Sequence, residues 1–245
     1  MEPLKIAYLF PDLLNLYGDG GNVTCLQKRC EWRGIPVETI LVNHGESIDL
    51  ECVDIVFLGG GPDREQRLAS EQLLRMKDDL SAYVEHDGVL LAICGGYQIL
   101  GSEWLLGSEI VEGLGIIDMV THRGGVNRLI DNIVLRSPVC ERPVVGYENH
   151  AGRTILGEGM RPFGTVISKT GHGNDDTSGS DGVLYRNLVG TYLHGPLLGK
   201  NPGVADYLLK RALERKQGAA VDLTVLDDAV ENAANEFICN RFGGE

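Results

Sequence analysis

The chain has 245 residues, and its 22 Lys and Arg residues against 35 Asp and Glu residues give a formal net charge of −13. This negative balance, without a basic cluster, excludes a nucleic-acid binder and argues against docking on an anionic membrane surface. The 43% hydrophobic and 23% charged composition excludes wholesale disorder and is typical of a soluble globular protein.

Glycine is over-represented, and cysteine is scattered. The 33 glycines are about twice the usual share, which predicts sharp turns and close approaches of the backbone. The six cysteines form no CxxC pair, so we expect free, mostly buried thiols in a cytoplasmic protein. No apolar run approaches the roughly 20 residues of a membrane-spanning helix, and no secretory signal is visible.

The first half of the chain alternates predicted strands with predicted helices. Short, mostly apolar segments predict strands at residues 5–10, 37–42, 53–58 and 89–93, and helical spacing predicts helices at 23–33 and 63–86. Strands that are apolar on both faces and alternate with helices indicate a parallel sheet covered on both sides. We therefore predict an α/β fold with a doubly wound, mainly parallel sheet.

The second half predicts shorter strands separated by glycine-rich turns. They fall at residues 129–135, 144–147, 165–168 and 182–185, and helices follow at 202–216 and 226–238. This spacing favours antiparallel hairpins over crossovers. We expect one domain over residues 1–245, with a core at about 5–215 and a helical tail at 216–245.

The stretch LAICGGYQ, residues 91–98, is the sharpest chemical signal. A buried strand brings Cys94 into a turn made by Gly95 and Gly96, and a helix begins directly afterwards. A nucleophile on such an elbow is exposed at the carboxyl end of the sheet, close to a helix N-terminus that stabilises a thiolate. Cys94 is therefore the candidate nucleophile, and a buried structural cysteine is the alternative.

A thiolate that attacks a carbonyl needs donors for the developing oxyanion. The run LGGG, residues 58–61, ends the preceding predicted strand and should stand on the same sheet edge as Cys94. We expect the backbone N–H groups of Gly60 and Gly95 to bind the oxyanion. A glycine run chosen only for turning is the alternative.

Among the six histidines, His194 is the best candidate for the general base. It stands in GTYLHGP, after an apolar strand and before a proline-containing turn. His150 lies at a plausible pocket rim. His172 lies in the loop GHGNDD, residues 171–176, which we interpret as a flexible polar loop and not as a metal site.

Two nucleotide-binding patterns are missing from the sequence. No GxxxxGK[ST] loop and no GxGxxG turn at the first helix occurs. ATP, if the reaction consumes it, must therefore bind another chain.

The segments around Cys94 (ICGGYQ) and His194 (TYLHGP) resemble class I, triad-type glutamine amidotransferases, in the branch similar to cobyric acid synthase. The pattern G-x-C-x-G-x-Q matches, except that Ala92 replaces its first glycine. Further stretches more narrowly resemble the glutaminase subunits of lipid II isoglutaminyl synthases: residues 14–22, 59–66, 127–129, 146–154 and 173–176. The resemblance covers about residues 5–215.

The resemblance implies a reaction and a partner. Cys94 would attack the side-chain amide of L-glutamine to form a glutamyl thioester and release ammonia, with His194 activating the thiol and then water. Arg128 and Gln98 would bind substrate. Ammonia would pass to a MurT-like, Mur-ligase-type subunit of a heterodimer, which would carry ATP and Mg and amidate the α-carboxyl of D-glutamate on lipid II. No cofactor is expected in this chain.

One departure from the broad class concerns the third member of the triad. The class has His-x-Glu, but Pro196 stands two residues after His194. An imidazole without an orienting acid is a weaker base. We therefore expect a Cys–His dyad whose activity depends on an aspartate from the partner subunit.

Two other interpretations remain open from the sequence. The glutaminase could serve a different acceptor, such as a cobyrinate-like carboxylate. Alternatively, the chain could be a non-catalytic scaffold, although the retained Cys94, Gln98 and His194 speak against this.

Overall fold

The computed structural model describes residues 2–106, 108–125 and 127–244. Its centre is a six-stranded sheet in the order β13-β14-β4-β3-β1-β2. The strands are β1 (Leu4–Leu9), β2 (Val37–Val42), β3 (Ile55–Leu58), β4 (Val89–Ile93), β13 (Val183–Tyr185) and β14 (Leu188–Thr191). Neighbours from β14 to β2 pair in parallel, and β13 pairs antiparallel with β14. The predicted mainly parallel sheet is confirmed.

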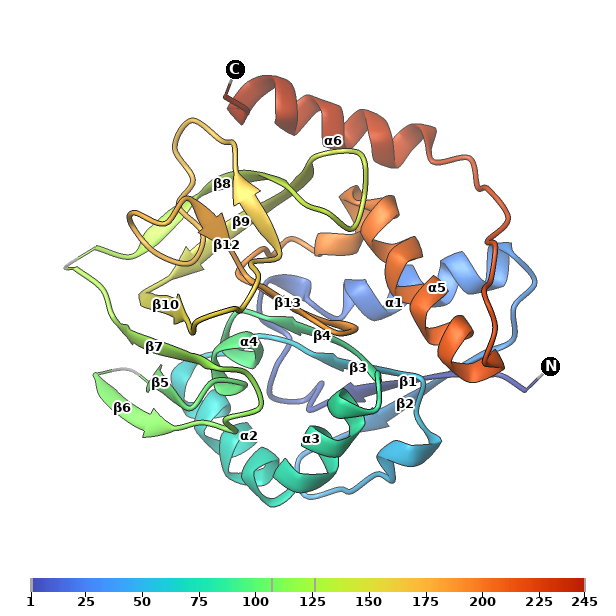
Figure 1. Cartoon of the computed structure of the whole chain (residues 1–245), viewed down its shortest axis with the longest axis horizontal. Coiled ribbons are helices and arrows are strands. Elements are labelled where there is room, and N and C mark those ends of the chain that lie inside the picture. Colours follow the sequence, from blue (N-terminus) through green and yellow to red (C-terminus); the bar gives the residue numbers. More distant parts are fainter. Residues whose placement is uncertain (1, 107, 126, 245) are drawn as a thin grey trace.

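Helices cover both faces of this sheet (Figure 1). In this view α1 (Gly21–Trp32) and α5 (Pro202–Gln217) lie above the sheet, and α2 (Asp63–Arg75) and α3 (Lys77–Glu85) lie below it. The central strands β3 and β4 are buried along their whole length, because both of their faces are covered. This is the doubly wound α/β architecture predicted from the alternating elements.

The single helix predicted over residues 63–86 is wrong, because the chain breaks at Met76 into α2 and α3. Met76 has φ −99° and ψ 7°, outside the helical range. A continuous helix of that length would extend about 36 Å. The strands β3 and β4 have four and five residues and extend only about 13–17 Å. Because the chain breaks at Met76, the apolar faces of both α2 and α3 can pack on this short sheet.

Two four-stranded sheets extend the fold on one side. One has the order β10-β7-β5-β6 and the other β12-β11-β8-β9. Their strands are β5 (Glu103–Leu106), β6 (Glu109–Glu112), β7 (Met119–Arg123), β8 (Leu129–Arg136), β9 (Val144–His150), β10 (Gly152–Leu156), β11 (Gly164–Val166) and β12 (Ser180–Asp181). Apart from a parallel contact between β5 and β7, the pairs are antiparallel. The predicted antiparallel character of the second half is confirmed.

The C-terminal helix α6 (Ala229–Phe242) lies along β8, β9 and the short 3-10 helix η3 (Leu197–Lys200), at the top of Figure 1. The start of α6 is held against α1. The buried guanidinium of Arg29 in α1 binds the carboxylate of Asp228, directly before α6, at 2.6 Å, and that of Asp206 in α5 at 2.7 Å. Residues 229–242 of the tail therefore pack on the fold as a regular helix.

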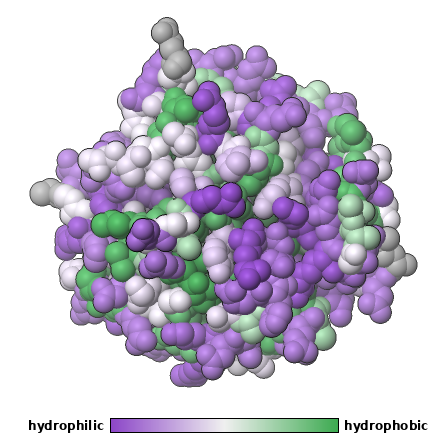
Figure 2. Space-filling model, in the orientation of Figure 1, coloured by the Kyte–Doolittle hydropathy of each residue, from purple (hydrophilic) through white to green (hydrophobic). Residues whose placement is uncertain are grey.

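The visible face of the molecule is mainly hydrophilic, with small hydrophobic patches (Figure 2). Among the described residues, the helices are too short or too polar to cross a bilayer. The six cysteines are free thiols.

Candidate active site

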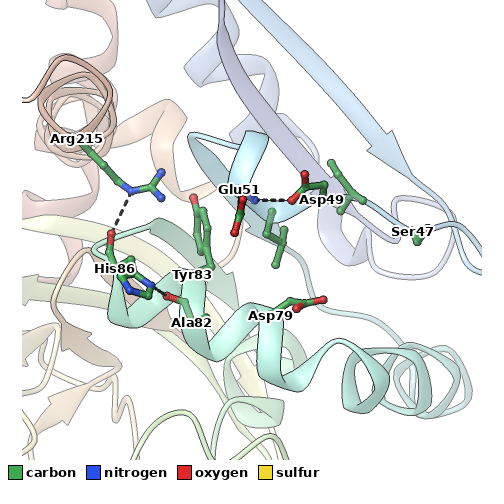
Figure 3. A pocket seen from close by; sticks show the side chains of 10 residues that line it. Ser47, Asp49, Glu51, Asp79, Ala82, Tyr83, His86 and Arg215 are labelled. Atoms are coloured by element: carbon green, nitrogen blue, oxygen red, sulfur yellow. Dashed lines mark hydrogen bonds between the residues drawn. The ribbon is translucent and has the colours of Figure 1, made fainter.

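Four loops meet at the carboxyl edge of the central sheet. The loop after β1 carries Asp19, the loop after β3 carries Gly60, and the loops after β4 and β14 carry Cys94 and His194. In a doubly wound sheet this edge is where ligands bind. A separate cavity of 670 Å³ lies at the opposite edge, where Tyr83 and Arg215 line it (Figure 3), so it is remote from these loops.

Cys94 stands on the tight turn that the sequence predicts between β4 and a helix, α4 (Gly95–Ile99). Its φ of +51° is a left-handed conformation that a side chain rarely adopts. A Cβ atom at Gly96 would approach the carbonyl oxygen of Gly59 to 2.7 Å, so this position needs glycine. The backbone N–H of Cys94 donates to Thr191 O at 2.8 Å, which fixes the elbow against β14.

His194 is fully buried, and both its backbone and its ring are held. Its N–H donates to Tyr147 O at 2.8 Å, and its carbonyl accepts from Tyr147 N at 3.3 Å. The ring nitrogen Nδ1 lies 3.0 Å from Asp19 Oδ1, so Nδ1 carries the proton of this bond. Nε2 has no hydrogen-bond partner among the described residues and is left to serve Cys94.

Asp19 occupies the place of the acid that the sequence analysis expected from a partner subunit. Its side chain is fully buried, and its second oxygen Oδ2 accepts the N–H of Gly60 at 3.0 Å. Pro196 does stand two residues after His194, but a carboxylate of this same chain reaches the imidazole. The stretch LYGDGGN contains Asp19, yet no local rule connects a turn aspartate to a histidine 175 residues away.

The ring of His194 favours the charged form. Burial opposes the imidazolium, but the negative charge of the Cys94 thiolate and the hydrogen bond to Asp19 outweigh this and raise the pKa of His194 to about 10. A protonated His194 beside Cys94 would stabilise the thiolate, the reactive form of a cysteine nucleophile.

The expectation that Gly60 donates to an oxyanion is corrected by its hydrogen bond. Its N–H is already bound by Asp19 Oδ2. The neighbouring Gly61 lines the cavity beside Cys94, and its N–H donates to no acceptor among the described residues. Gly95 offers the first N–H of α4, which has no intrahelical acceptor. Gly61 and Gly95 are thus the donors that this geometry provides.

A cavity of 380 Å³ opens beside Cys94 and contains both predicted substrate-binding residues. Arg128 lies on its wall with Nε donating to Asn149 Oδ1 at 2.9 Å and a terminal nitrogen donating to Asn149 O at 2.8 Å. Gln98 is almost fully buried, and its Nε2 donates to Tyr192 Oη at 3.0 Å. The cavity therefore places the Arg128 cation and the Gln98 side-chain amide beside Cys94.

Tyr17 is a site residue that the sequence analysis missed. Its ring packs edge-on against the imidazole of His194, with centroids 5.0 Å apart and planes at 73°. Its φ of +56° is again left-handed. Its hydroxyl accepts from Asn149 Nδ2 at 2.6 Å, so Tyr17 covers His194 and is joined to the residue that holds Arg128.

His150 lines the same cavity, as its predicted position at a rim suggested. Its Nδ1 bonds to Gly152 O at 2.8 Å, and its ring stacks on Tyr192 at 3.5 Å. Burial lowers the pKa of His150, which favours a neutral ring. This histidine is therefore fixed in the wall of the cavity and lacks the aspartate contact of His194.

The loop at residues 171–176 is fastened to the neighbouring strands. Glu148 on β9 accepts the N–H groups of His172 and Gly173, each at 2.8 Å, and Arg153 on β10 binds Asp176. Within the described ranges, no cluster of three or more His, Cys, Asp or Glu side chains has the geometry of a metal site. The loop acts as a brace for strands that border the cavity.

Comparison of the sequence with known families and proteins agrees with this site. Residues 5–202 match the family model described as the CobB/CobQ-like glutamine amidotransferase domain. The chain is 42% identical over 244 residues to the lipid II isoglutaminyl synthase (glutamine-hydrolyzing) subunit GatD of Staphylococcus aureus, covering 98% of this chain and 97% of the relative. It is 36% identical to the GatD subunit of Streptococcus pneumoniae, covering 96% and 90%.

Comparison of the fold gives a consistent architecture. The structure of PurLQS from Thermotoga maritima aligns with a TM-score of 0.61 and 14% identity, covering 87% of this chain and 99% of that one. At this level of identity the similarity concerns the fold alone.

Proposed function

The chain belongs to the CobB/CobQ-like glutamine amidotransferase family, and on this premise we propose that it is the glutamine-hydrolysing subunit of a lipid II isoglutaminyl synthase. The observation that carries the proposal is the union of the Cys94 elbow with a buried His194–Asp19 pair in a chain related over nearly its whole length to two such subunits.

In the first step the Cys94 thiolate attacks the side-chain amide carbon of glutamine. The carbonyl oxygen becomes an oxyanion, for which Gly61 and Gly95 offer backbone N–H groups. The imidazolium of His194 then gives its Nε2 proton to the departing nitrogen. The C–N bond breaks, ammonia leaves, and a glutamyl thioester remains on Cys94.

In the second step the neutral His194 removes a proton from water. The resulting hydroxide attacks the thioester carbon, the C–S bond breaks, and glutamate leaves while the Cys94–His194 ion pair is restored. Asp19 keeps the Nδ1 proton in place throughout, so Nε2 faces the reacting atoms, and its charge stabilises the imidazolium.

Substrate recognition falls to Arg128 and Gln98, two of the polar residues that line the cavity. The Arg128 guanidinium can bind the α-carboxylate of glutamine through two parallel hydrogen bonds, a geometry that suits this side chain. Gln98 can bind a polar group of the substrate through its side-chain oxygen, since its Nε2 is already bound to Tyr192.

The ammonia would serve a MurT-like, Mur-ligase-type partner that binds ATP and Mg and amidates the α-carboxyl of D-glutamate on lipid II. This assignment is supported by the two GatD relatives, which are subunits of lipid II isoglutaminyl synthases, and by the lack of a phosphate-binding loop in this sequence. The reaction would take place in the cytoplasm, with the membrane reached only through the lipid-linked acceptor.

The test is co-purification with a Mur-ligase-type subunit, followed by amidation of lipid II from glutamine and ATP. We expect the complex to produce isoglutamine-containing lipid II, and a Cys94→Ser complex to do so only when free ammonia is added. Failure of the wild-type complex with both glutamine and ammonia would refute the acceptor. Unchanged glutamine-dependent amidation by Cys94→Ser would refute the nucleophile.

A further inference from the structure

The imidazole of His194 and the carboxylate of Asp19 stand on separate loops, after β14 and after β1. Their hydrogen bond of 3.0 Å can persist only if those two loops keep a fixed spacing. An error of about 1 Å in such an arrangement is enough to impair catalysis strongly. The groups that hold the loops together are therefore part of the catalytic geometry.

Asn22 joins the two loops directly. Its side chain is fully buried, and its Nδ2 donates to Asp19 O at 3.0 Å while its Oδ1 accepts from Leu198 N at 2.9 Å. Leu198 belongs to η3, which follows His194. One amide thus links the backbone of the acid to the segment that continues from the histidine.

Asn201 closes the far end of the histidine segment. Its Oδ1 accepts from Val145 N and its Nδ2 donates to Val145 O, both at 2.8 Å, so the side-chain amide pairs with β9 as a strand residue would. At the near end, the backbone of His194 pairs with Tyr147 of the same strand. Residues 194–201 are therefore anchored to β9 at both ends.

The C-terminal helix supplies the outer side of this anchor. Asn235 Nδ2 lies 2.9 Å from Pro143 O, 3.0 Å from Lys200 O and 3.1 Å from Asn201 Oδ1. Asn235 is the one buried residue of α6. Burying a side-chain amide destabilises the fold unless the amide is hydrogen-bonded. The N–H groups of Asn235 bind the end of the segment 194–201 and the residue before β9.

We propose that Asn235 is a positioning residue for glutamine hydrolysis, which makes the C-terminal helix a part of the machinery that sets His194 against Asp19. The inference rests on the proposed function. The helix lies beyond residues 5–202, the range of the matched domain model, so this support is an addition to that domain. Its path of action is Asn235 to Asn201, Asn201 to β9 and η3, and from there to His194.

The experiment compares Asn235→Ala with Asn240→Ala, which changes an exposed asparagine of the same helix, in the full-length chain with its partner. We expect Asn235→Ala to lower kcat roughly tenfold to a hundredfold with little change in KM. We also expect the basic limb of its kcat/KM profile to move to lower pH, because a lengthened His194–Asp19 bond stabilises the imidazolium less. Asn240→Ala should match the wild type in all three readouts.

A variant that only loses stability, without moving His194 relative to Asp19, can be distinguished by NMR. In the wild-type chain the Nδ1 proton of His194 should give a downfield proton NMR resonance, which Asn235→Ala should shift or broaden and Asn240→Ala should not. A normal resonance and an unmoved pH profile in Asn235→Ala would overturn the proposal, even if kcat fell.

If Asn235→Ala does not fold, Asn235→Ser keeps one donor and should show an intermediate pH shift; a wild-type profile would again overturn the proposal. The resonance does not depend on turnover, so a chain without glutaminase activity would refute the proposed function and still test the positioning.

Discussion

Cys94 and His194 lie side by side at Gly60 but are held in different ways. The Cys94 elbow is made by consecutive residues: a buried strand, a left-handed φ of +51° and two glycines that permit close packing. His194 depends on contacts with residues far from it in the chain, including Asp19, Asn22 and Tyr147. One side of the site is local, and the other is assembled by tertiary folding.

The difference bears on how each side can fail. A local elbow persists as long as the strand and helix beside it persist. The histidine side depends on several hydrogen bonds between elements, each worth about 0.5–1.5 kcal/mol net, so remote substitutions can loosen it without unfolding the chain. We therefore expect substitutions that remove these hydrogen bonds to lower activity even when they lie far from His194. Substitutions that lie far from Cys94 should not disturb its elbow and should leave activity unchanged.

The largest expected effect comes from removing the nucleophile. Cys94→Ala should lower glutamine hydrolysis by roughly 10⁴-fold or more, because no thioester can form. Cys52→Ala, which removes an exposed thiol remote from this edge, is the matched control and should be neutral. Glutamate release measured under saturating glutamine would decide, and a rate near that of the wild type in Cys94→Ala would show that another group attacks.

The next effect concerns the acid. Asp19→Asn should lower kcat by roughly 10² to 10⁴-fold, because the imidazole loses both its orienting acceptor and the charge that stabilises its protonated form. The rate should be measured for the isolated chain and for the complex, with Asp49→Asn, an exposed aspartate at the opposite edge, as the control. If the Asp19→Asn complex kept full activity while the isolated chain lost it, the partner would supply the acid after all.

The same contrast explains what the sequence could predict. The Cys94 elbow is recognisable because its determinants lie within eight residues, and the parallel sheet because its central strands β3 and β4 are continuous apolar runs. Asp19 was not recognised as the acid because its role comes from a contact with a residue 175 positions away. Gly60 was assigned the wrong role for the same reason: its N–H is claimed by that aspartate.

The missed elements follow a similar rule. Strand β5 begins with a glutamate, β6 has one at each end, and both have only four residues, so neither contains an apolar run long enough to detect. The break at Met76 carries no glycine or proline signal, and it depends on the dimensions of the sheet beneath. The match of the predicted and observed β2, in contrast, needed only its own six residues.

A third prediction tests the place where the two sides of the site meet. A methyl group at Gly60 would lie 3.2 Å from Cys94 Cβ and 3.3 Å from His194 Cε1, closer than most real contacts. Gly60→Ala should therefore push the pair apart and lower kcat about tenfold, which corresponds to about 1.4 kcal/mol. Gly199→Ala, in η3, meets nothing within 4 Å and should keep the wild-type rate. Equal rates for both variants would show that the spacing at Gly60 is not critical.

The smallest expected effect is on stability and concerns Asp181, which is hydrogen-bonded to the residues that precede His194. Asp181 on β12 is fully buried and accepts hydrogen bonds from the Thr191 hydroxyl and from Tyr192 N. Burial raises its pKa to about 7, whereas the unfolded chain has the ordinary value of 3.8. Between these values the folded state holds a proton that the unfolded state has lost, so the free energy of unfolding falls as the pH rises from about 4 to 7.

Asp181→Asn should remove this dependence, because the amide cannot ionise and its oxygen can still accept from Thr191. Denaturant unfolding at pH 5, 6, 7 and 8 should give a flatter curve for the variant, by at most about 1.4 kcal/mol per pH unit. Parallel curves would show that the carboxyl is ionised throughout this range.

Thr191 also accepts the N–H of Cys94 through its carbonyl, so it touches both the elbow and the strand that leads to His194. If the two sides are held independently, Asp181→Asn should leave kcat unchanged while the stability profile flattens; a fall in kcat would mean that Thr191 couples them.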